Sequence, residues 1–158
     1  MKQVDVLIIG AGAAGMMCAV EAGRRGRSVL IVDHAKAPGD KIRISGGGRC
    51  NFTNLNAAPQ NYISKNPHFC ISALRRYTQR HFIALVDRYG IAWHEKTLGQ
   101  LFCDGSAKQI IDLLVTEMKQ ANVELRLQSV VESIEATADG YTVALSGERV
   151  RCTSLVVA

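Results

Sequence analysis

The chain has 158 residues, of which 47 % are hydrophobic and 21 % are charged, and its formal net charge is +5. The length suits one domain, the apolar content is enough to build a core, and no block of like charge suggests a disordered tail. The five cysteines are odd in number and include no CxxC pair. This argues against a disulfide framework and a structural zinc site, and it favours a reducing, cytoplasmic compartment. The net positive charge fits a phosphate-bearing cofactor or a polyanionic partner such as RNA.

The first 33 residues have the pattern of a strand, a helix and a second strand. Residues 4–9 are a short apolar run with branched side chains, which predicts a buried strand. A glycine-rich turn follows, and then a helix that Gly26 ends, with Glu21, Arg24 and Arg25 on its solvent face. Residues 28–33 predict a second buried strand. Two such strands joined by a helix are typical of a parallel sheet covered by helices. The apolar run over residues 6–20 is too short to span a membrane, so we expect no membrane partner.

The middle of the chain predicts a long loop followed by two helices. Residues 35–61 have no helical or strand period and are rich in Gly, Asn and Pro. We interpret them as a loop that carries function, because long loops in compact domains are usually functional or disordered. Residues 66–77 predict a helix that begins at Asn66-Pro67. Thr78 caps the next helix, and Gly90 ends it.

The last third of the chain predicts a short strand, a helix and a small antiparallel meander. The short strand covers residues 91–94, and Ser106 with Gln109 forms a capping box for the helix. The apolar face of this helix is Ile110, Ile111, Leu114 and Met118. Segments 123–127, 141–145 and 148–152 predict the strands of the meander, with turn signals between them. A further apolar strand begins at Leu155, and we expect the domain to continue beyond it.

Gly10, Gly12 and Gly15 form a GxGxxG pattern between the first strand and the first helix. In this pattern the first glycine allows the tight turn, the second lets the backbone approach a pyrophosphate, and the third lets helix and strand pack closely. Asp33 lies 18 residues after Gly15, at the end of the second strand, where an acid accepts hydrogen bonds from ribose hydroxyls. It also disfavours a 2′-phosphate, so the pattern predicts FAD or NAD rather than NADP.

A second motif, KIRISGGGRCNFTN, occupies residues 41–54. Its three consecutive glycines expose backbone N–H groups that can face a flat ring or an anion. Lys41 and Arg49 can neutralise phosphate, and Asn51 and Asn54 offer amide groups. A plain NAD-binding domain has no need of such a loop, although a flexible glycine linker is the alternative interpretation.

The glycine turn, Asp33 and above all this loop resemble the BaiN/YhiN-like, aminoacetone oxidase-like flavoproteins. The stretch GIAWHEKTLGQLFCD at residues 90–104 is similar to the YhiN branch. The resemblance implies an α/β fold: an FAD-type Rossmann domain, doubly wound, with a mainly parallel sheet and a small antiparallel β-meander. Family members are more than twice this length, so residues 1–158 are expected to be the N-terminal part of an FAD-binding domain, without the substrate domain.

By resemblance, the glycine turn and Asp33 hold the ADP half of FAD, and Lys41 with the following loop lines the flavin half. The cofactor-binding residues expected from the motifs and the resemblance together are Gly10, Gly12, Ala13, Ala14, Gly15, Asp33, His34, Lys41, Ser45, Gly46, Gly47, Gly48, Arg49, Cys50 and Asn51. Cys50 is the candidate catalytic residue, as a proton donor, and packing under the flavin ring is its alternative role. His34, His68 and His81 have no metal-ligand spacing with one another, so no metal is expected.

The resemblance implies a redox reaction at carbon, with a hydride moving between flavin and an organic substrate. The YhiN branch looks like enzymes that reduce uridine in ribosomal RNA to dihydrouridine, and NAD(P)H is the expected external reductant. The alternatives are an amine-oxidising flavoenzyme, a simple NAD-binding domain, an RNA-binding fragment and an inactive truncated chain. Arg75, Arg76, Arg80 and Arg88 lie on two successive helices. They form either an RNA-facing patch or an ordinary solvated face.

Overall fold

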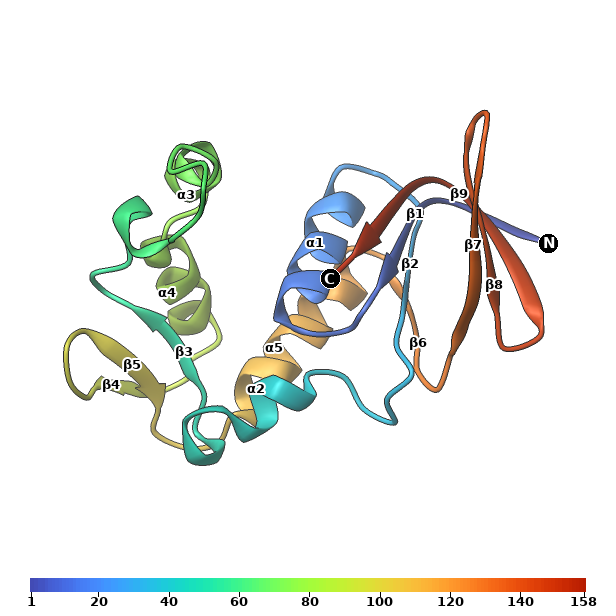
Figure 1. The fold of residues 1–158 in the computed structure, drawn as a ribbon. Helices are drawn as coiled ribbons and strands as arrows, with labels where there is room; N and C mark the ends of the chain where they lie inside the picture. Colours follow the sequence, from blue (N-terminus) through green and yellow to red (C-terminus); the bar gives the residue numbers. More distant parts are fainter. The chain divides into compact units, whose positions relative to one another are not determined.

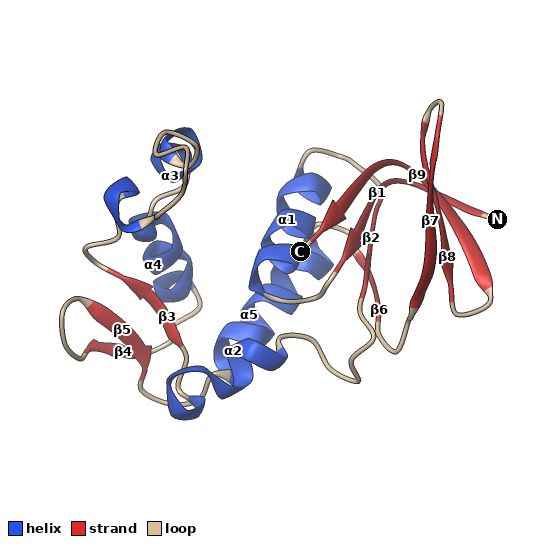
Figure 2. Cartoon of the chain, viewed as in Figure 1, coloured by secondary structure: helices blue, strands red, loops and turns tan.

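The computed structural model describes residues 1–158 and divides them into two compact units. The first unit comprises Met1–Ile42 and Ile111–Ala158, and the second unit is Arg43–Ile110. Figure 1 follows the chain through its elements, and Figure 2 marks helices and strands. The structure contains no helix with both the length and the apolar character needed to cross a membrane.

The first unit contains a six-stranded sheet. In spatial order its strands are β6 (Glu124–Arg126), β2 (Val29–Val32), β1 (Lys2–Ile9), β9 (Glu148–Val157), β8 (Gly140–Leu145) and β7 (Val131–Thr137). The first four strands are parallel, and β9, β8 and β7 are antiparallel. This confirms the predicted Rossmann architecture with its small meander.

Burial of the central strands explains their sequence. All four residues of β2 are buried, and Leu7 and Ile8 of β1 have no exposed surface. A parallel strand covered on both faces needs a continuous apolar run rather than alternation, because neither face meets water. Val6 pairs with Val29 and Ile9 with Val32, so the two predicted strands lie in register.

The strand β9 corrects one expectation, since the two separate strands predicted near its sequence are one continuous element. Residues 148–152 pair antiparallel with β8, and the strand continues beside β1 in parallel as far as Val157. Thr153 and Ser154, which lie between the two predicted segments, are part of the strand. The Thr153 hydroxyl donates to the backbone oxygen of Asp5, which secures this part of β9 to β1.

The expected membership of the meander was also wrong. The segment near Val123 forms β6, which joins β2 in parallel and takes no part in the meander. The first strand of the meander is β7, which the sequence pattern did not indicate. Its register with β8 shifts between Val131 and Ser133, and almost all of its side chains are exposed. A bulge of this kind interrupts the alternation on which strand prediction depends.

Two helices of the first unit pack against each other through small residues and one charge pair. They are α1 (Ala13–Arg24) and α5 (Lys108–Gln120), of which α5 begins in the second unit. A side chain at Gly23 would meet the backbone oxygen of Ala121 at 2.4 Å, so the two helices approach closely there. Glu117 is only 1 % exposed and pairs with Arg24. Arg24, expected only on the solvent face of the helix, therefore also neutralises a buried carboxylate.

The predicted apolar face of α5 and its capping box are confirmed. Ile110, Ile111, Leu114 and Met118 are buried. The Ser106 N–H donates to the Gln109 side chain, and the Lys108 N–H donates to the Ser106 hydroxyl.

The second unit contains a three-stranded antiparallel sheet in the order β3 (Asn51–Asn54), β5 (Gln100–Cys103), β4 (Trp93–Glu95). Its helices are α3 (Ile71–Arg76) and α4 (Gln79–Arg88), with 3₁₀ turns at Ser45–Gly48 and Pro59–Asn61. The short helix α2 (Asp40–Ile44) lies at the boundary of the two units.

Two expectations for this region were wrong. The segment 35–61 is not one loop, because α2, two 3₁₀ turns and β3 lie within it. These elements are too short for a periodic pattern to develop. The helix expected from Asn66 begins only at Ile71, because residues 67–70 form turns. The predicted start of α4 after Thr78 is confirmed.

We expect Arg24→Ala to lower the free energy of unfolding by about 3 kcal/mol, because the buried Glu117 carboxylate would lose its Arg24 partner. The measurement is urea denaturation of the purified chain. Arg25→Ala is the matched control, since Arg25 pairs with Glu21 at the surface and should cost less than about 1 kcal/mol. Equal losses for both variants would contradict a special role for the buried pair.

Candidate functional site

The three glycines of the turn between β1 and α1 differ in how much space surrounds each of them. Gly10 has a φ of +109°, and a side chain there would meet the backbone oxygen of Ala158 at 2.3 Å. A side chain at Gly15 would lie 1.9 Å from the Gly10 oxygen. Gly12, by contrast, has an ordinary φ of −82°, and a side-chain carbon added there would have no atom within 4 Å. Gly10 and Gly15 are therefore required by the fold itself, whereas Gly12 leaves open space.

The N-terminus of α1 has no cap from a side chain and no acidic residue in its first turn. The first N–H groups of a helix have no partner within the helix, and the helix dipole gives this end a partial positive charge. Ala13, Ala14 and Gly15 occupy this end of the helix and line one cavity. The position is suited to an anionic group such as phosphate.

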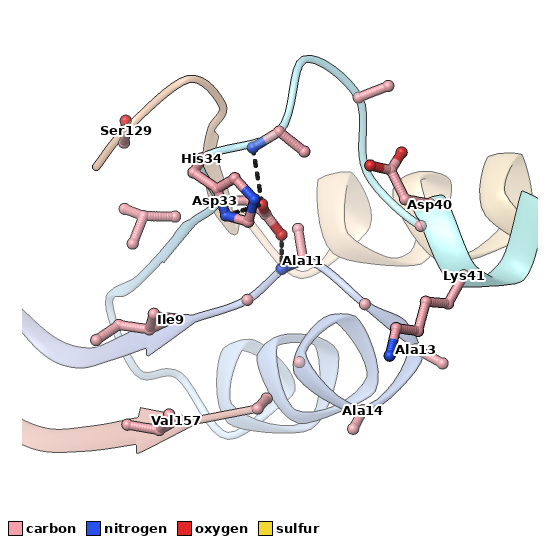
Figure 3. A pocket seen from close by; sticks show the side chains of 18 of the residues that line it. Ile9, Ala11, Ala13, Ala14, Asp33, His34, Asp40, Lys41, Ser129 and Val157 are labelled. Carbon is pink, nitrogen blue, oxygen red and sulfur yellow. Dashed lines mark hydrogen bonds and ion pairs between the residues drawn. The ribbon is translucent and has the colours of Figure 1, made fainter. Parts of the chain in front are cut away.

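Asp33 links the turn to the end of β2, as Figure 3 shows. One carboxylate oxygen accepts from the Ala11 N–H at 2.7 Å, and the other accepts from the Ala35 N–H at 2.9 Å. Partial burial raises the pKa of this carboxyl, but the backbone hydrogen bonds and nearby His34 outweigh burial and lower it. Each carboxylate oxygen has two acceptor positions, so Asp33 can still accept further donors.

These residues line a cavity of about 910 Å³ in the first unit. Its wall includes every expected residue from this unit: Gly10, Gly12, Ala13, Ala14, Gly15, Asp33, His34 and Lys41. Lys41 lies on α2, and Figure 3 labels it among the residues that line the cavity. The cavity lies at the carboxyl ends of the parallel strands β1, β2 and β9, which is where ligands bind in open α/β sheets.

The cavity also has lining residues that the sequence interpretation missed. Ser129, Val130 and Val131 lie just before and at the start of β7, and Val157 and Ala158 end β9. The Ser129 N–H donates to the Asp33 backbone oxygen at 2.9 Å, which holds this segment at the end of β2. No local signal marks these residues, because they reach the cavity only through the pairing of distant strands.

The second part of the expected site, Ser45–Asn51, lies in the second unit. Gly46, Gly47 and Gly48 all have positive φ, as does Cys50 with +53°. A side chain at Gly46 would meet the Phe102 ring at 2.6 Å, whereas Gly47 and Gly48 have no atom within 4 Å. The Cys103 N–H donates to the Arg49 oxygen and the Ala107 N–H to the Gly48 oxygen. The loop is therefore anchored to β5 and is not a free linker.

Cys50 and Cys103 are both buried thiols of the second unit. Burial raises the pKa of Cys50, and it raises that of Cys103 to about 11, with smaller effects from Cys50 and Asp104. Both side chains therefore keep their protons at neutral pH. No group of three or more Cys, His, Asp or Glu side chains in the chain is arranged to hold a metal ion.

His94 has a partner that the sequence did not indicate. Its Nδ1 lies 2.6 Å from the Asp104 carboxylate, and its ring stacks on Phe102 with 6.2 Å between centroids. Glu95, its neighbour in β4, faces the opposite side, because adjacent strand residues alternate in direction. The pairing of β4 with β5 places His94 directly opposite Phe102 on the neighbouring strand.

A parallel sheet, a glycine turn at an open helix N-terminus and an acid at the end of the next strand together define a dinucleotide-binding Rossmann domain. The chain belongs to the HI0933-like family, whose Rossmann-domain description matches residues 4–158. This confirms the resemblance predicted from the glycine turn and the loop that follows Lys41.

Two relatives in sequence are named ribosomal RNA dihydrouridine synthase. The one from Escherichia coli K12 is 58 % identical over 158 residues, which is 100 % of this chain and 40 % of that protein. The one from Haemophilus influenzae is 45 % identical and covers 96 % of this chain and 39 % of that protein. The chain thus spans about 40 % of the length of these relatives.

Solved structures with the same fold include glycine oxidase from Geobacillus kaustophilus. It has a TM-score of 0.71, 15 % identity, and a match covering 100 % of this chain and 55 % of that one. A variant of the halogenase PltM in complex with FAD has a TM-score of 0.61 and 21 % identity, over 99 % of this chain and 34 % of that one. At these identities the likeness concerns the fold alone, which is of the Rossmann type.

We expect Gly15→Ala to destabilise the chain by about 3 kcal/mol, because the added carbon would overlap the Gly10 oxygen. Gly12→Ala should change stability by less than about 1 kcal/mol, since its added carbon meets no protein atom. Thermal and urea denaturation of both variants would measure the difference. A large loss in Gly12→Ala would show that this glycine is also a requirement of the fold.

Asp33 should make the stability of the chain depend on pH at the acidic end. Its folded-state pKa lies below the unfolded value of about 3.9, so the carboxylate stabilises the fold fully above that value. This contribution should disappear as the pH falls through the lowered pKa. We expect Asp33→Asn to flatten the stability curve below about pH 4, as measured by urea denaturation. Asp139→Asn, at the exposed turn between β7 and β8, should keep the wild-type slope.

Proposed function

We propose that the chain is the FAD-binding portion of a flavin-dependent oxidoreductase. The observation that carries the proposal is the 910 Å³ cavity at the ends of β1, β2 and β9. It combines an uncapped helix N-terminus, open space at Gly12 and the carboxylate of Asp33. These groups fit a pyrophosphate and a ribose, which are the parts of FAD that a Rossmann domain holds.

The roles proposed for the residues follow from their chemistry. The backbone at Gly12, Ala13, Ala14 and Gly15 faces the pyrophosphate, and Asp33 with neighbouring His34 contacts the ribose. Lys41 supplies positive charge to the phosphates. Ser45, Gly46, Gly47, Gly48, Arg49, Cys50 and Asn51 are proposed to line the flavin. The burial of Cys50 supports packing under the ring over proton donation, because only 5 % of the residue is exposed.

The proposed substrate of the whole protein is uridine in ribosomal RNA. The 58 % and 45 % identities to two proteins named ribosomal RNA dihydrouridine synthase support it. When bound, FAD supplies the capacity to accept a hydride from one molecule and to pass it to another. Conversion of uridine to dihydrouridine adds one hydride and one proton across the C5–C6 double bond. NAD(P)H is the proposed external source of the hydride.

The direct test is titration of the purified chain with FAD, followed by the visible spectrum and by quenching of flavin fluorescence. Gly12→Val should weaken FAD binding about tenfold to a hundredfold, because its side chain would occupy the space proposed for phosphate. Asp33→Ala should also weaken binding. Ala136→Val on the exposed strand β7 is the control for an added side chain and should bind FAD as the parent does.

The substrate is tested with a fusion of residues 1–158 to the remaining part of the Escherichia coli relative. We expect this fusion to form dihydrouridine in ribosomal RNA when NAD(P)H is present, and the same fusion with Gly12→Val to lose the activity. An FAD-loaded, folded fusion that leaves uridine unchanged would contradict the substrate. Failure of both the chain and the fusion to bind FAD would contradict the proposed function as a whole.

A further inference from the structure

The charges of the chain are distributed unequally between the two units. The second unit carries nine Lys or Arg and three Asp or Glu, a net charge of +6, whereas the first unit carries ten and eleven, a net charge of −1. Residues 41–86 contain seven Lys or Arg and no acidic residue at all. The net positive charge of the whole chain therefore comes from the second unit.

The two units also use their cations differently. In the first unit, most cations pair with carboxylates, namely Lys2, Arg24, Arg25, Arg126, Arg149 and Arg151, whereas the exposed Arg27, Lys36, Lys41 and Lys119 form no ion pair. In the second unit, Lys65, Arg75, Arg76 and Arg80 are exposed and have no ion-pair partner. Unpaired cations in a region without acids repel one another, which costs folding free energy unless an anion binds there.

Arg75 and Arg76 lie beside two hollows on the surface of the second unit. One hollow, of about 480 Å³, is lined by His68, Ile71, Ser72, Arg75 and Arg76. The other, of about 600 Å³, has Arg75 in its wall together with four aromatic side chains, Phe52, Tyr62, Tyr77 and Phe82. We call this second hollow the aromatic pocket. Arg75 belongs to both walls, so the two hollows adjoin each other along α3.

The aromatic pocket has a rigid base and an accessible rim. Phe52 packs against Phe82 and Trp93, with ring centroids 6.1 Å and 6.3 Å apart. Tyr62 at the rim is 49 % exposed. Thr53, Thr78 and Gln79 add polar groups to the wall, and the Gln79 amide is fixed by donation to the Leu55 oxygen. A planar group can stack on such rings and still meet polar partners.

We infer that this surface binds single-stranded RNA, with phosphates at Arg75 and Arg76 and an unpaired base in the aromatic pocket. The inference rests on the proposed function, in which RNA is the substrate, and it names the part of the chain that holds the strand. Cations along a groove and aromatic rings for the bases are the two elements of single-strand binding. Bases in an RNA helix are hidden from such a pocket, so the strand must be unpaired there.

The test measures binding of a fluorescein-labelled, uridine-rich 12-nucleotide RNA to the 158-residue chain by fluorescence anisotropy. The double variant Arg75→Gln/Arg76→Gln should bind about tenfold more weakly at 100 mM salt, and its logarithmic salt dependence should become shallower by about 1.4. Tyr62→Ala should weaken binding about tenfold through loss of base stacking, without a change in the salt dependence. Circular dichroism and urea denaturation confirm that each variant is folded.

The matched control is Arg149→Gln/Arg151→Gln, which removes two cations from the first unit and should change RNA affinity less than about twofold. Equal weakening by both double variants would overturn the inference, because it would reduce the effect to net charge. Competition by poly-L-glutamate as strong as that by unlabelled RNA would also overturn it, in favour of an acidic protein partner. FAD titration of the same variants should be unchanged. Loss of RNA binding with normal FAD binding therefore tests this surface separately from the cofactor site.

Discussion

The hydrogen bond from the Ala11 N–H to the Asp33 carboxylate joins the glycine turn to the end of the neighbouring strand, and the cavity depends on it. The turn can approach this closely because neither Gly10 nor Gly15 carries a side chain that would meet the backbone. As a result, the helix α1 begins at the cavity with its N–H groups free. The same carboxylate that fixes the turn also remains able to accept a ribose hydroxyl. One side chain thus serves both the fold and the proposed cofactor.

The two units differ in how they use charge. The first unit places Lys2, Arg24, Arg25, Arg126, Arg149 and Arg151 in ion pairs, and the pair of Arg24 with buried Glu117 is the most enclosed of them. The second unit leaves Arg75 and Arg76 without ion-pair partners beside an aromatic pocket. The residues proposed to hold the pyrophosphate and the ribose lie in the first unit, whereas the surface inferred to bind an anionic strand lies in the second unit.

The triple-glycine loop at Ser45–Asn51 depends on contacts that its own sequence does not indicate. Gly46 is required because a side chain would meet the Phe102 ring, whereas Gly47 and Gly48 have space around them and positive φ. Hydrogen bonds from Cys103 of β5 and from Ala107, just before α5, hold the loop in place. Phe102 in turn stacks with His94, whose partner is Asp104. A local sequence pattern therefore depends on residues that lie about fifty positions further along the chain.

The sequence by itself determined the strand–helix–strand start, the glycine turn, the place of Asp33, the apolar face of α5 and the family. These features depend on local backbone geometry and on periodic burial, which neighbouring residues express directly. Only the tertiary structure decided that β6 pairs with β2, that β9 is one continuous strand, and that Ser129 and Val157 line the cavity. The same holds for the pairs Arg24–Glu117 and His94–Asp104. An exposed strand such as β7 or a short parallel strand such as β6 has no local signal for its partner, because the partner is chosen by the packing of distant segments.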